Sequence, residues 1–303
     1  MGVGSGIPAL EADGRAWYDG VGGVPSLSQI VSGKSFTAVA VSTAAKAGEW
    51  LKTRLGQPTS VQTKSSERDL VTEVDRGTET MIRNLIRTHF PGHAFLGEEG
   101  TGAGEPGTVT VEEAAEAEYV WMIDPIDGTT NFVHGFPFFS ISLALAHRGE
   151  VIVGVIYDPS RDELFVAEKN KGAYVRGRRM SVSRESTLGE SLLATGFPSR
   201  SADLERSVAA VAHLAPRVRN IRTAGSAALH LAYVAAGRLS GFFEPGLNAW
   251  DVAAGVLLVR ESGGTVTDMD GRPFRLGTRD IVATNGRVHG ELLAALRTAG
   301  CAG

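Results

Sequence analysis

Apolar residues recur at helical spacing in the first patterned stretch of the chain. Steps of three and four residues place them on one face of a helix; they are Phe36, Ala40, Ala44, Ala47, Leu51 and Leu55. A second helix is predicted to begin after Thr72, because residues 72–75 read Thr-Glu-Val-Asp, a capping-box sequence whose acid is Asp75. Its apolar positions continue to Ile86, and Pro91 bounds it. We expect both helices to pack on a sheet.

Strand patterns follow in the middle of the chain. Residues 119–123 form a continuous apolar run, and residues 140–147 alternate between larger apolar and smaller side chains. The glycine-containing residues 148–150 predict a hairpin connection to a strand at 151–157. Two more short strands extend this antiparallel sheet, at residues 164–167 and 173–175.

Strand and helix patterns alternate after about residue 190. The predicted strands are residues 192–195, 218–222, 242–243 and 281–284. The predicted helices are residues 204–214, 226–236, 250–262 and 288–298. This alternation is typical of an α/β fold in which helical layers share sheets.

Two stretches lack any sustained period. Residues 1–33 are rich in glycine and small side chains, which predicts a flexible N-terminal extension. Residues 100–118 are glycine-rich and then acidic, and we expect a solvated loop there. The remainder, 34–303, is predicted to be one folded domain. Its first half, 34–185, holds the larger antiparallel sheet, and 186–303 forms a C-terminal α/β half.

Composition narrows the class of protein. Hydrophobic residues make up 43% and charged residues 21% of the 303 positions, as in ordinary globular proteins. A net charge of −4 gives no reason to expect a nucleic acid or an anionic membrane as partner. The single cysteine, Cys301, cannot form an intrachain disulfide, which favours a reducing compartment. With no signal-peptide pattern and no apolar run of roughly 18 residues, we expect a cytoplasmic protein.

The most informative segment is the octapeptide at residues 124–131, Asp-Pro-Ile-Asp-Gly-Thr-Thr-Asn. It follows a predicted strand, at the edge where α/β proteins place ligands. Asp124 and Asp127 can both turn into one cavity, while Ile126 can offer only its backbone carbonyl. Three oxygen donors this close suit a hard cation such as Mg²⁺. The Asp-Gly pair alone would indicate only a turn, but the whole octapeptide favours a metal site.

The second part of the octapeptide is suited to an anion. Gly128 lets bare backbone N–H groups approach a phosphate, and amides at a turn or helix start are an established phosphate cradle. Thr129 adds a hydroxyl beside the metal that could orient a water. The octapeptide therefore indicates chemistry on a phosphate ester next to a bound cation.

Further acids could join this site. Glu98 and Glu99 lie in a glycine-flanked loop after an apolar run, where on their own they would be solvated charge. Asp251 begins an otherwise apolar helix, where it could simply complement the helix dipole, but a buried charge needs partners. Two carboxylates about 4 Å apart repel by on the order of 4 kcal/mol at an effective dielectric constant near 20. Four such groups can gather in ionised form only around divalent ions.

Three separate motifs of this chain resemble the inositol monophosphatase family. They are Gly-Glu-Glu at 97–99, the octapeptide with Phe132, and Trp-Asp-Val-Ala-Ala-Gly at 250–255. The resemblance runs from about residue 36 to the C-terminus and leaves out the first 33 residues. It implies an αβαβα layered sandwich, usually a homodimer, and a phosphoric monoester hydrolase. It also implies a requirement for Mg²⁺, with two or three ions per site and Mn²⁺ as a possible substitute, and inhibition by lithium.

The resemblance assigns metal ligands residue by residue. Glu98, Asp124 and the carbonyl of Ile126 are similar to the ligands of a first metal ion. Asp124, Asp127 and Asp251 are similar to the ligands of a second. Glu99 is a possible further member of the site.

Other roles also follow from the resemblance. Thr129, held by Asp75, is similar to the pair that orients the attacking water, together with Glu98. The implied reaction is in-line attack of a metal-activated water on phosphorus, with Asp127 also in the catalytic group. The amides of Gly128 and Thr129 would hold the phosphate, and Lys64 is similar to a mobile-loop lysine near the site.

The family's contacts with the substrate alcohol match positions in the C-terminal half. Gly225, Ser226 and Ala227 match one part of this set, and Asp251 borders it. Glu244 matches the acid that contacts the inositol ring, since a carboxylate accepts hydrogen bonds from hydroxyls; alone it could be a solvated residue after a strand. These matches predict inositol 1-phosphate as the substrate.

Alternative substrates and roles stay open. Fructose 1,6-bisphosphate is the strongest competing substrate, ahead of other sugar phosphates and histidinol phosphate. Arg200 and Arg222 could meet a second phosphate, although surface ion pairs are the simpler role. Thr130 favours the inositol monophosphatase branch, because relatives acting on other esters commonly replace it. A non-catalytic regulatory scaffold would be free to lose the acids, all of which this chain keeps.

Overall fold

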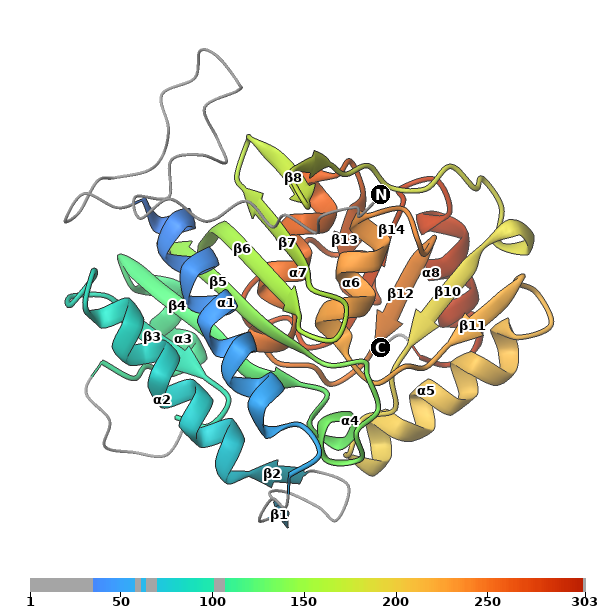
Figure 1. Ribbon diagram of the computed structural model, residues 1–303. Coiled ribbons are helices and arrows are strands. Elements are labelled where there is room, and N and C mark those ends of the chain that lie inside the picture. The colour runs from blue at the N-terminus through green and yellow to red at the C-terminus, as the bar shows by residue number, and fades with distance from the viewer. Residues whose placement is uncertain (1–34, 58–60, 64–69, 101–106, 302–303) are drawn as a thin grey trace, which may run out of the picture.

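Five layers of secondary structure make up the protein, in the order helix, sheet, helix, sheet, helix (Figure 1). The computed structural model describes residues 35–57, 61–63, 70–100 and 107–301. The α-helices in this part are α1 Phe36–Arg54, α2 Glu73–Arg87, α3 Val111–Glu116, α4 Thr129–Val133, α5 Ser201–Leu214, α6 Ala227–Ala235, α7 Ala249–Glu261 and α8 His289–Thr298. The predicted αβαβα sandwich is confirmed.

The larger sheet has seven strands in sequence order, β3 to β9. They are β3 Ala94–Gly97, β4 Tyr119–Asp127, β5 Ser140–His147, β6 Glu150–Asp158, β7 Glu163–Glu168, β8 Gly172–Val175 and β9 Arg178–Arg179. Only the β3–β4 pair is parallel. The predicted hairpin between β5 and β6 is present, with Arg148 and Gly149 both at positive φ, as a tight primed turn requires.

The second sheet has five strands in the order β11-β10-β12-β14-β13. They are β10 Leu192–Thr195, β11 Asn220–Arg222, β12 Gly241–Glu244, β13 Thr265–Thr267 and β14 Ile281–Thr284. β10 lies parallel to both β11 and β12, whereas β14 is antiparallel to its neighbours. A separate pair, β1 Val61–Thr63 and β2 Leu70–Thr72, is antiparallel.

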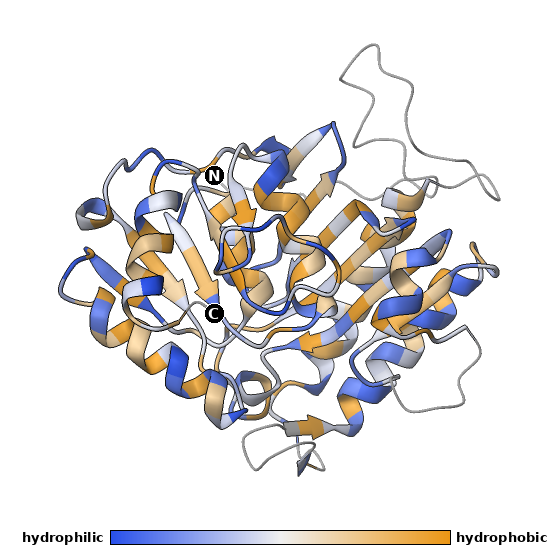
Figure 2. Ribbon diagram, turned by 180° about the vertical axis from the view of Figure 1, so that it is seen from behind, coloured by the Kyte–Doolittle hydropathy of each residue, from blue (hydrophilic) through white to orange (hydrophobic). Residues whose placement is uncertain are grey.

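Three apolar clusters hold the layers together. The outer one joins α1 and α2 to one face of the larger sheet, with Trp121 fully buried in it. The largest fills the space around α6 and α7, between the two sheets. The third packs α5 and α8 on the far face of the five-stranded sheet. Figure 2 shows the same division, with hydrophobic residues dense in the strands and polar residues striping the outer helices.

The stretch predicted as a solvated loop, residues 100–118, contains a helix, so that prediction is wrong there. α3 is a short helix opened by a capping box. The Thr110 N–H donates to Glu113 Oε2, and the Glu113 N–H donates to Thr110 Oγ1. Ala114 is its buried residue. The Thr-x-x-Glu pattern at residues 110–113 is typical of a helix start, but the acidic composition of this stretch led to the prediction of a loop.

The ends of other predicted helices and strands differ by a few residues from those in the structure. The strand predicted at 119–123 continues through Pro125 to Asp127. The helix predicted at 204–214 begins at Ser201, and the strand predicted at 218–222 begins at Asn220. The predicted N-terminal extension and Lys64 lie outside the described residues. Within the described part, no helix has both the length and the apolar character needed to cross a membrane.

Candidate active site

A bulge in β4 sets the direction of the two aspartates of the octapeptide. Asp124 pairs with Ser142, and Asp127 pairs with Ser140. The two aspartates are therefore three positions apart on β4, whereas their partners are two positions apart on β5. Without the extra residue, side chains three positions apart would point to opposite faces of the sheet. With it, both aspartates share the face on which Ser140 and Ser142 lie. That face meets the middle layer, because the Ser142 hydroxyl donates to the Trp250 carbonyl at 3.3 Å.

Glu98 reaches the same place from the neighbouring strand. Its backbone N–H donates to the Ile123 carbonyl at 3.1 Å, which continues the β3–β4 pairing by one residue. The Glu98 side chain forms a hydrogen bond with the Asp124 carboxyl. Two loops distant in sequence therefore bring their acids together at the ends of parallel strands.

Asp251 comes from the middle layer. It is in the first turn of α7, and its carboxylate accepts the Asn248 N–H at 2.7 Å. This is the capping contact that the sequence left open as an alternative. It does not remove the acid from the site, since the charges of Glu98 and Asp127 both act on Asp251.

Burial and neighbouring carboxyl groups raise the pKa values of Asp124 and Asp251. Burial raises the pKa of Asp124 well above its usual value, and so do the neighbouring carboxyls of Glu98, Asp127 and Asp251. The pKa of Asp251 is also raised well above its usual value, first by burial and then by Glu98. Burial raises the pKa of Asp127 to about 6, although hydrogen bonds from Ser226 and Ala228 oppose the shift.

Carboxylate oxygens, which these four acids provide, are the type of ligand that a hard divalent cation takes. Among the described residues, no three acids, histidines or cysteines are already grouped as a complete metal site. Asp127 and Asp251 accept hydrogen bonds from N–H and O–H donors of the protein. The raised pKa values nevertheless express an excess of negative charge that a divalent ion would neutralise. We therefore regard the donor set as fitting Mg²⁺.

A pH dependence of stability follows for the protein stripped of divalent ions by EDTA. The folded-state pKa of Asp127 is about 6, above the ordinary value of 3.8 for an aspartate. Its contribution to stability is therefore fully present below about pH 4 and is lost as pH rises through about 6, a change on the order of 3 kcal/mol. The wild-type Tm should fall between about pH 4 and pH 6 relative to that of Asp127→Asn. Calorimetry of both proteins would contradict this if their Tm difference were the same at every pH.

Thr129 lies against two acceptors. Its Oγ1 is 3.0 Å from Asp75 Oδ1 and 3.1 Å from the Ile126 carbonyl oxygen. The other oxygen of Asp75 accepts both the N–H and the hydroxyl of Thr72, the N-cap of α2. Asp75 thus caps its helix with one oxygen and contacts Thr129 with the other. A hydroxyl has one proton, so once Thr129 donates it, the Thr129 oxygen can only accept from a further group.

Gly128 is required by the turn between β4 and α4. Its φ is +98°, and an added Cβ would lie 2.9 Å from the Gly225 carbonyl oxygen and 3.1 Å from that of Phe138. Both the left-handed backbone and the close carbonyls exclude a side chain. α4 begins at the next residue, so the N–H groups of Thr129 and Thr130 have no partner within the helix.

The turn before α6 binds Asp127 directly. Ser226 Oγ donates to Asp127 Oδ2 at 2.5 Å, and the Ala228 N–H donates to the same oxygen at 2.7 Å. The Ala227 N–H donates to Oδ1 at 3.3 Å. Ser226 and Ala227, predicted as substrate contacts, therefore also hold an acid of the site. Ala228 was missed, because nothing local in the sequence links it to a residue a hundred positions earlier.

The sequence alone assigned no role to Asn131, the last residue of the octapeptide. Its Nδ2 donates to the carbonyls of Phe138 at 2.6 Å and Ala224 at 2.7 Å. It thereby joins α4 to the turn that contains Gly225, where a Cβ would lie 2.9 Å from Asn131 Nδ2. The side chain acts as a clamp between the two loops that carry most of the site.

Glu244 ends β12 beside the acid cluster. It is buried, and its pKa is raised well above the usual value by burial and then by the charges of Asp127 and Asp251. Among the described residues, none donates a hydrogen bond to this carboxyl. Its carboxyl packs against Gly196, where an added Cβ would lie 2.1 Å from Glu244 Oε2. A buried acid without a protein donor is suited to a ligand that donates hydrogen bonds.

The remaining predicted residues lie at the edge of the site. Glu99 follows Glu98 in the loop, and its N–H donates to Glu79 Oε2 at 2.7 Å. Arg200 is exposed and forms an ion pair with Asp203 at 3.6 Å. This is the surface ion pair that the sequence offered as its simpler role. The exposed Arg222 donates to the Ile221 carbonyl at 3.1 Å.

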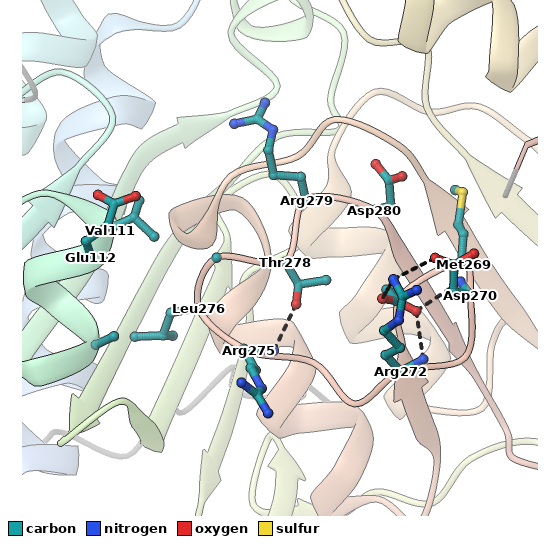
Figure 3. A pocket seen from close by; sticks show the side chains of 13 residues that line it. Val111, Glu112, Met269, Asp270, Arg272, Arg275, Leu276, Thr278, Arg279 and Asp280 are labelled. Atoms are coloured by element: carbon teal, nitrogen blue, oxygen red, sulfur yellow. Dashed lines mark hydrogen bonds and ion pairs between the residues drawn. The ribbon is translucent and has the colours of Figure 1, made fainter. Parts of the chain in front are cut away.

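A hollow of about 610 Å³ lies elsewhere, between α3 and the loop of residues 268–280 (Figure 3). Charges of both signs line it, and Arg272 is paired with Asp270 at 2.7 Å. Its link to the acid cluster runs through Arg279, whose Nη1 donates to Asn248 Oδ1 at 2.8 Å. None of the four clustered acids lines the hollow, so it is not the site described above.

Comparison with known proteins decides the family. The family model described as "Inositol monophosphatase family" matches residues 33–300. The chain belongs to the inositol monophosphatase family. The match leaves out the first 32 residues and spans all the acids of the site.

Relatives within the inositol monophosphatase family cover nearly their whole length. An "Inositol-1-monophosphatase" of Mesorhizobium japonicum is 39% identical over 262 residues, which are 86% of this chain and 95% of the relative. The "Nus factor SuhB" of Escherichia coli K12 is 41% identical over 261 residues, 86% of this chain and 94% of the relative. A solved IMPase of Thermotoga maritima is 36% identical with a TM-score of 0.77, covering 86% of this chain and 96% of that one. The chain is accordingly a phosphatase of this family.

Proposed function

We propose that this family member hydrolyses a small phosphate monoester in a Mg²⁺-dependent reaction, with inositol 1-phosphate as its substrate. The observation that carries the proposal is the grouping of Glu98, Asp127 and Asp251 around the buried Asp124, beside the glycine turn at the start of α4. The name of the Mesorhizobium japonicum relative supports the substrate. The buried Glu244 supports a polyol, since it lacks a donor among the described side chains.

Two overlapping sets of oxygens would hold the metal. Glu98, Asp124 and the Ile126 carbonyl would bind one ion, and Asp124, Asp127 and Asp251 would bind a second. When bound, Mg²⁺ would act as a Lewis acid that lowers the pKa of a water and neutralises charge on the phosphoryl oxygens. Mn²⁺ would substitute, because it also accepts carboxylate ligands.

The chain's own groups orient the reactants. The Thr129 hydroxyl donates a hydrogen bond to Asp75, which leaves its oxygen to accept a hydrogen bond from the attacking water and so fix that water's direction. The amides of Gly128 and Thr129 hold the phosphate. The water oxygen bonds to phosphorus and the ester P–O bond breaks. One proton of the water ends on the departing alcohol oxygen, and the other stays on the released phosphate. Gly225, Ser226, Ala227 and Asp251 border the alcohol.

Further properties of the family extend the proposal. We infer a homodimer that is inhibited by lithium. We also infer a cytoplasmic location, which the single cysteine supports: Cys301 is buried and free of any disulfide.

Phosphate release from a panel of esters tests the substrate. The panel is inositol 1-phosphate, fructose 1,6-bisphosphate, histidinol phosphate and adenosine 3′,5′-bisphosphate, each with and without Mg²⁺. We expect the highest kcat/KM for inositol 1-phosphate. A lead by fructose 1,6-bisphosphate would keep the metal site and overturn the substrate. No release from any ester by the folded protein would favour a regulatory scaffold.

Glu244→Gln is expected to act on the alcohol and not on the phosphate. The amide accepts hydroxyl hydrogen bonds less strongly than a carboxylate, which corresponds to about a tenfold fall in kcat/KM for inositol 1-phosphate. Phenyl phosphate, which has no alcohol hydroxyls, should be hydrolysed by the variant and the wild type at rates within about twofold. Gly196→Ala should show the same selectivity, because its Cβ displaces Glu244. Equal losses on both esters would contradict the assignment.

A further inference from the structure

Helix α2 carries a stripe of ionisable residues on its buried face. Asp75, Glu79 and Arg83 follow one another at steps of four, which places them in line on one side of the helix. All three are at most 2% exposed. Buried charges of this kind need specific partners, and only Asp75 has been given a role so far.

Glu79 divides its two oxygens between the helix and a loop. Oε2 accepts the Glu99 N–H at 2.7 Å. Oε1 lies 2.8 Å from Arg83 Nε and 2.7 Å from Arg83 Nη2. Arg83 reaches on through Nη1 to Thr108 Oγ1 at 3.0 Å. The ion pair is thus attached to the chain at both Glu99 and Thr108.

Residues 97–100, here called the glutamate loop, lie directly on this ion pair. A Cβ at Gly97 would lie 2.3 Å from Glu79 Oε1, and one at Gly100 would lie 2.1 Å from Arg83 Nη2. Neither glycine has a positive φ, so the backbone alone would accept alanine. The glycines are therefore required by space, because the loop backbone touches the charged side chains.

We propose that Glu79, held by Arg83, is a positioning residue that fixes the glutamate loop and so places the Glu98 carboxylate beside Asp124. The inference rests on the proposed function in so far as Glu98 is proposed to bind metal. An apolar side chain of similar size would fill the space and could be at least as stabilising. It could not accept the Glu99 N–H, which is why an acid is needed at position 79.

The stripe also relates the glutamate loop to the rest of the site. One turn before Glu79, Asp75 holds Thr129. A single rigid helix therefore supports two loops that are about 30 residues apart in the chain. The one-turn spacing of Asp75 and Glu79 sets the position of Glu98 relative to Thr129.

Binding of Mn²⁺ to the full chain, followed by electron paramagnetic resonance, tests the proposal without using activity. Glu79→Ala should weaken the tightest Mn²⁺ site about tenfold or more, since the glutamate loop loses its anchor. Glu79→Gln keeps an oxygen for the Glu99 N–H and should stay within about threefold of the wild type. Gly100→Ala leaves α2 unchanged and should also weaken Mn²⁺ binding. This variant tests the proposal if Glu79→Ala does not fold.

Glu163→Ala is the matched control. Glu163 forms an ion pair with Arg238, which lies beyond the C-terminal end of α6, whereas Ser226 is at its N-terminal end. This variant should lower the Tm and leave Mn²⁺ affinity unchanged. Folded Glu79→Ala with wild-type Mn²⁺ affinity would overturn the proposal, as would an equal loss in Glu163→Ala. Absence of Mn²⁺ binding by the wild type would overturn the metal site itself, and this inference with it.

Discussion

Asp124→Asn should lower kcat by about 1,000-fold or more while the protein stays folded. Asp124 lies at the centre of the acid cluster, where the carboxyls of Glu98, Asp127 and Asp251 all act on it. It is also the one residue proposed to contact both metal ions. An amide has the same shape but carries no charge, so it would contribute far less to holding divalent ions.

The fold should tolerate this change because the carboxyl is already unfavourable there. Asp124 is 2% exposed, and burial among other acids raises its pKa well above the usual value. A neutral group of equal size removes that repulsion. In EDTA at pH 7, the Tm of Asp124→Asn should therefore equal or exceed that of the wild type. Circular dichroism and calorimetry measure this alongside phosphate release.

Asp158→Asn provides the control for Asp124→Asn. Asp158 is also a fully buried aspartate at the end of a strand, but its carboxylate accepts the N–H groups of Ser160 and Arg161. Its activity should stay within about threefold of the wild type. Retained turnover in Asp124→Asn would contradict the proposed metal site.

Thr129→Val should lower kcat about 100-fold. Valine has the shape of threonine without the hydroxyl, so the proposed water loses the acceptor that directs it. Asp75 Oδ1 also loses the hydrogen bond that it receives at 3.0 Å. Thr129→Ser keeps the hydroxyl and should recover activity to within about fivefold of the wild type. KM should change little in either variant, because the amide of residue 129 is unaffected.

Thr37→Val is a matched control for the loss of a hydroxyl. Thr37 is buried on α1, and its Oγ1 donates to Glu168 Oε2 at 2.9 Å, a bond of the same kind away from the site. This variant should retain wild-type kcat. If Thr129→Val and Thr37→Val lose activity equally, or if Thr129→Ser is no better than Thr129→Val, the orienting role is wrong.

Local signals in the sequence predicted most of the helices and strands, whereas the αβαβα layering and the roles of the site residues came from the family resemblance. The capping box at Thr72 predicted the start of α2, with Asp75 as its capping acid. The Asp-Gly pair at 127–128 indicated a turn, and the φ of +98° at Gly128 agrees. These features depend on residues within a few positions of one another, so a single sequence contains them.

Features set by distant contacts were not predictable in the same way. The β4 bulge depends on the register with Ser140 and Ser142, which no local pattern specifies. Glu79 and Arg83 have the spacing of an exposed salt bridge on a helix, and only packing of α2 on the sheet buries them. Helix α3 was missed for a different reason. Its capping box, Thr110 and Glu113, lies within four residues of sequence, but the acidic composition of the stretch was taken to indicate a loop.

The central claim is Mg²⁺-dependent hydrolysis at the acid cluster. The most direct measurement is phosphate release from inositol 1-phosphate by the full chain, first stripped of metal with EDTA and then supplied with Mg²⁺. We predict no release without Mg²⁺, full recovery on its addition, and no recovery in Asp124→Asn. Equal release with and without divalent ions, or full recovery in Asp124→Asn, would contradict the claim.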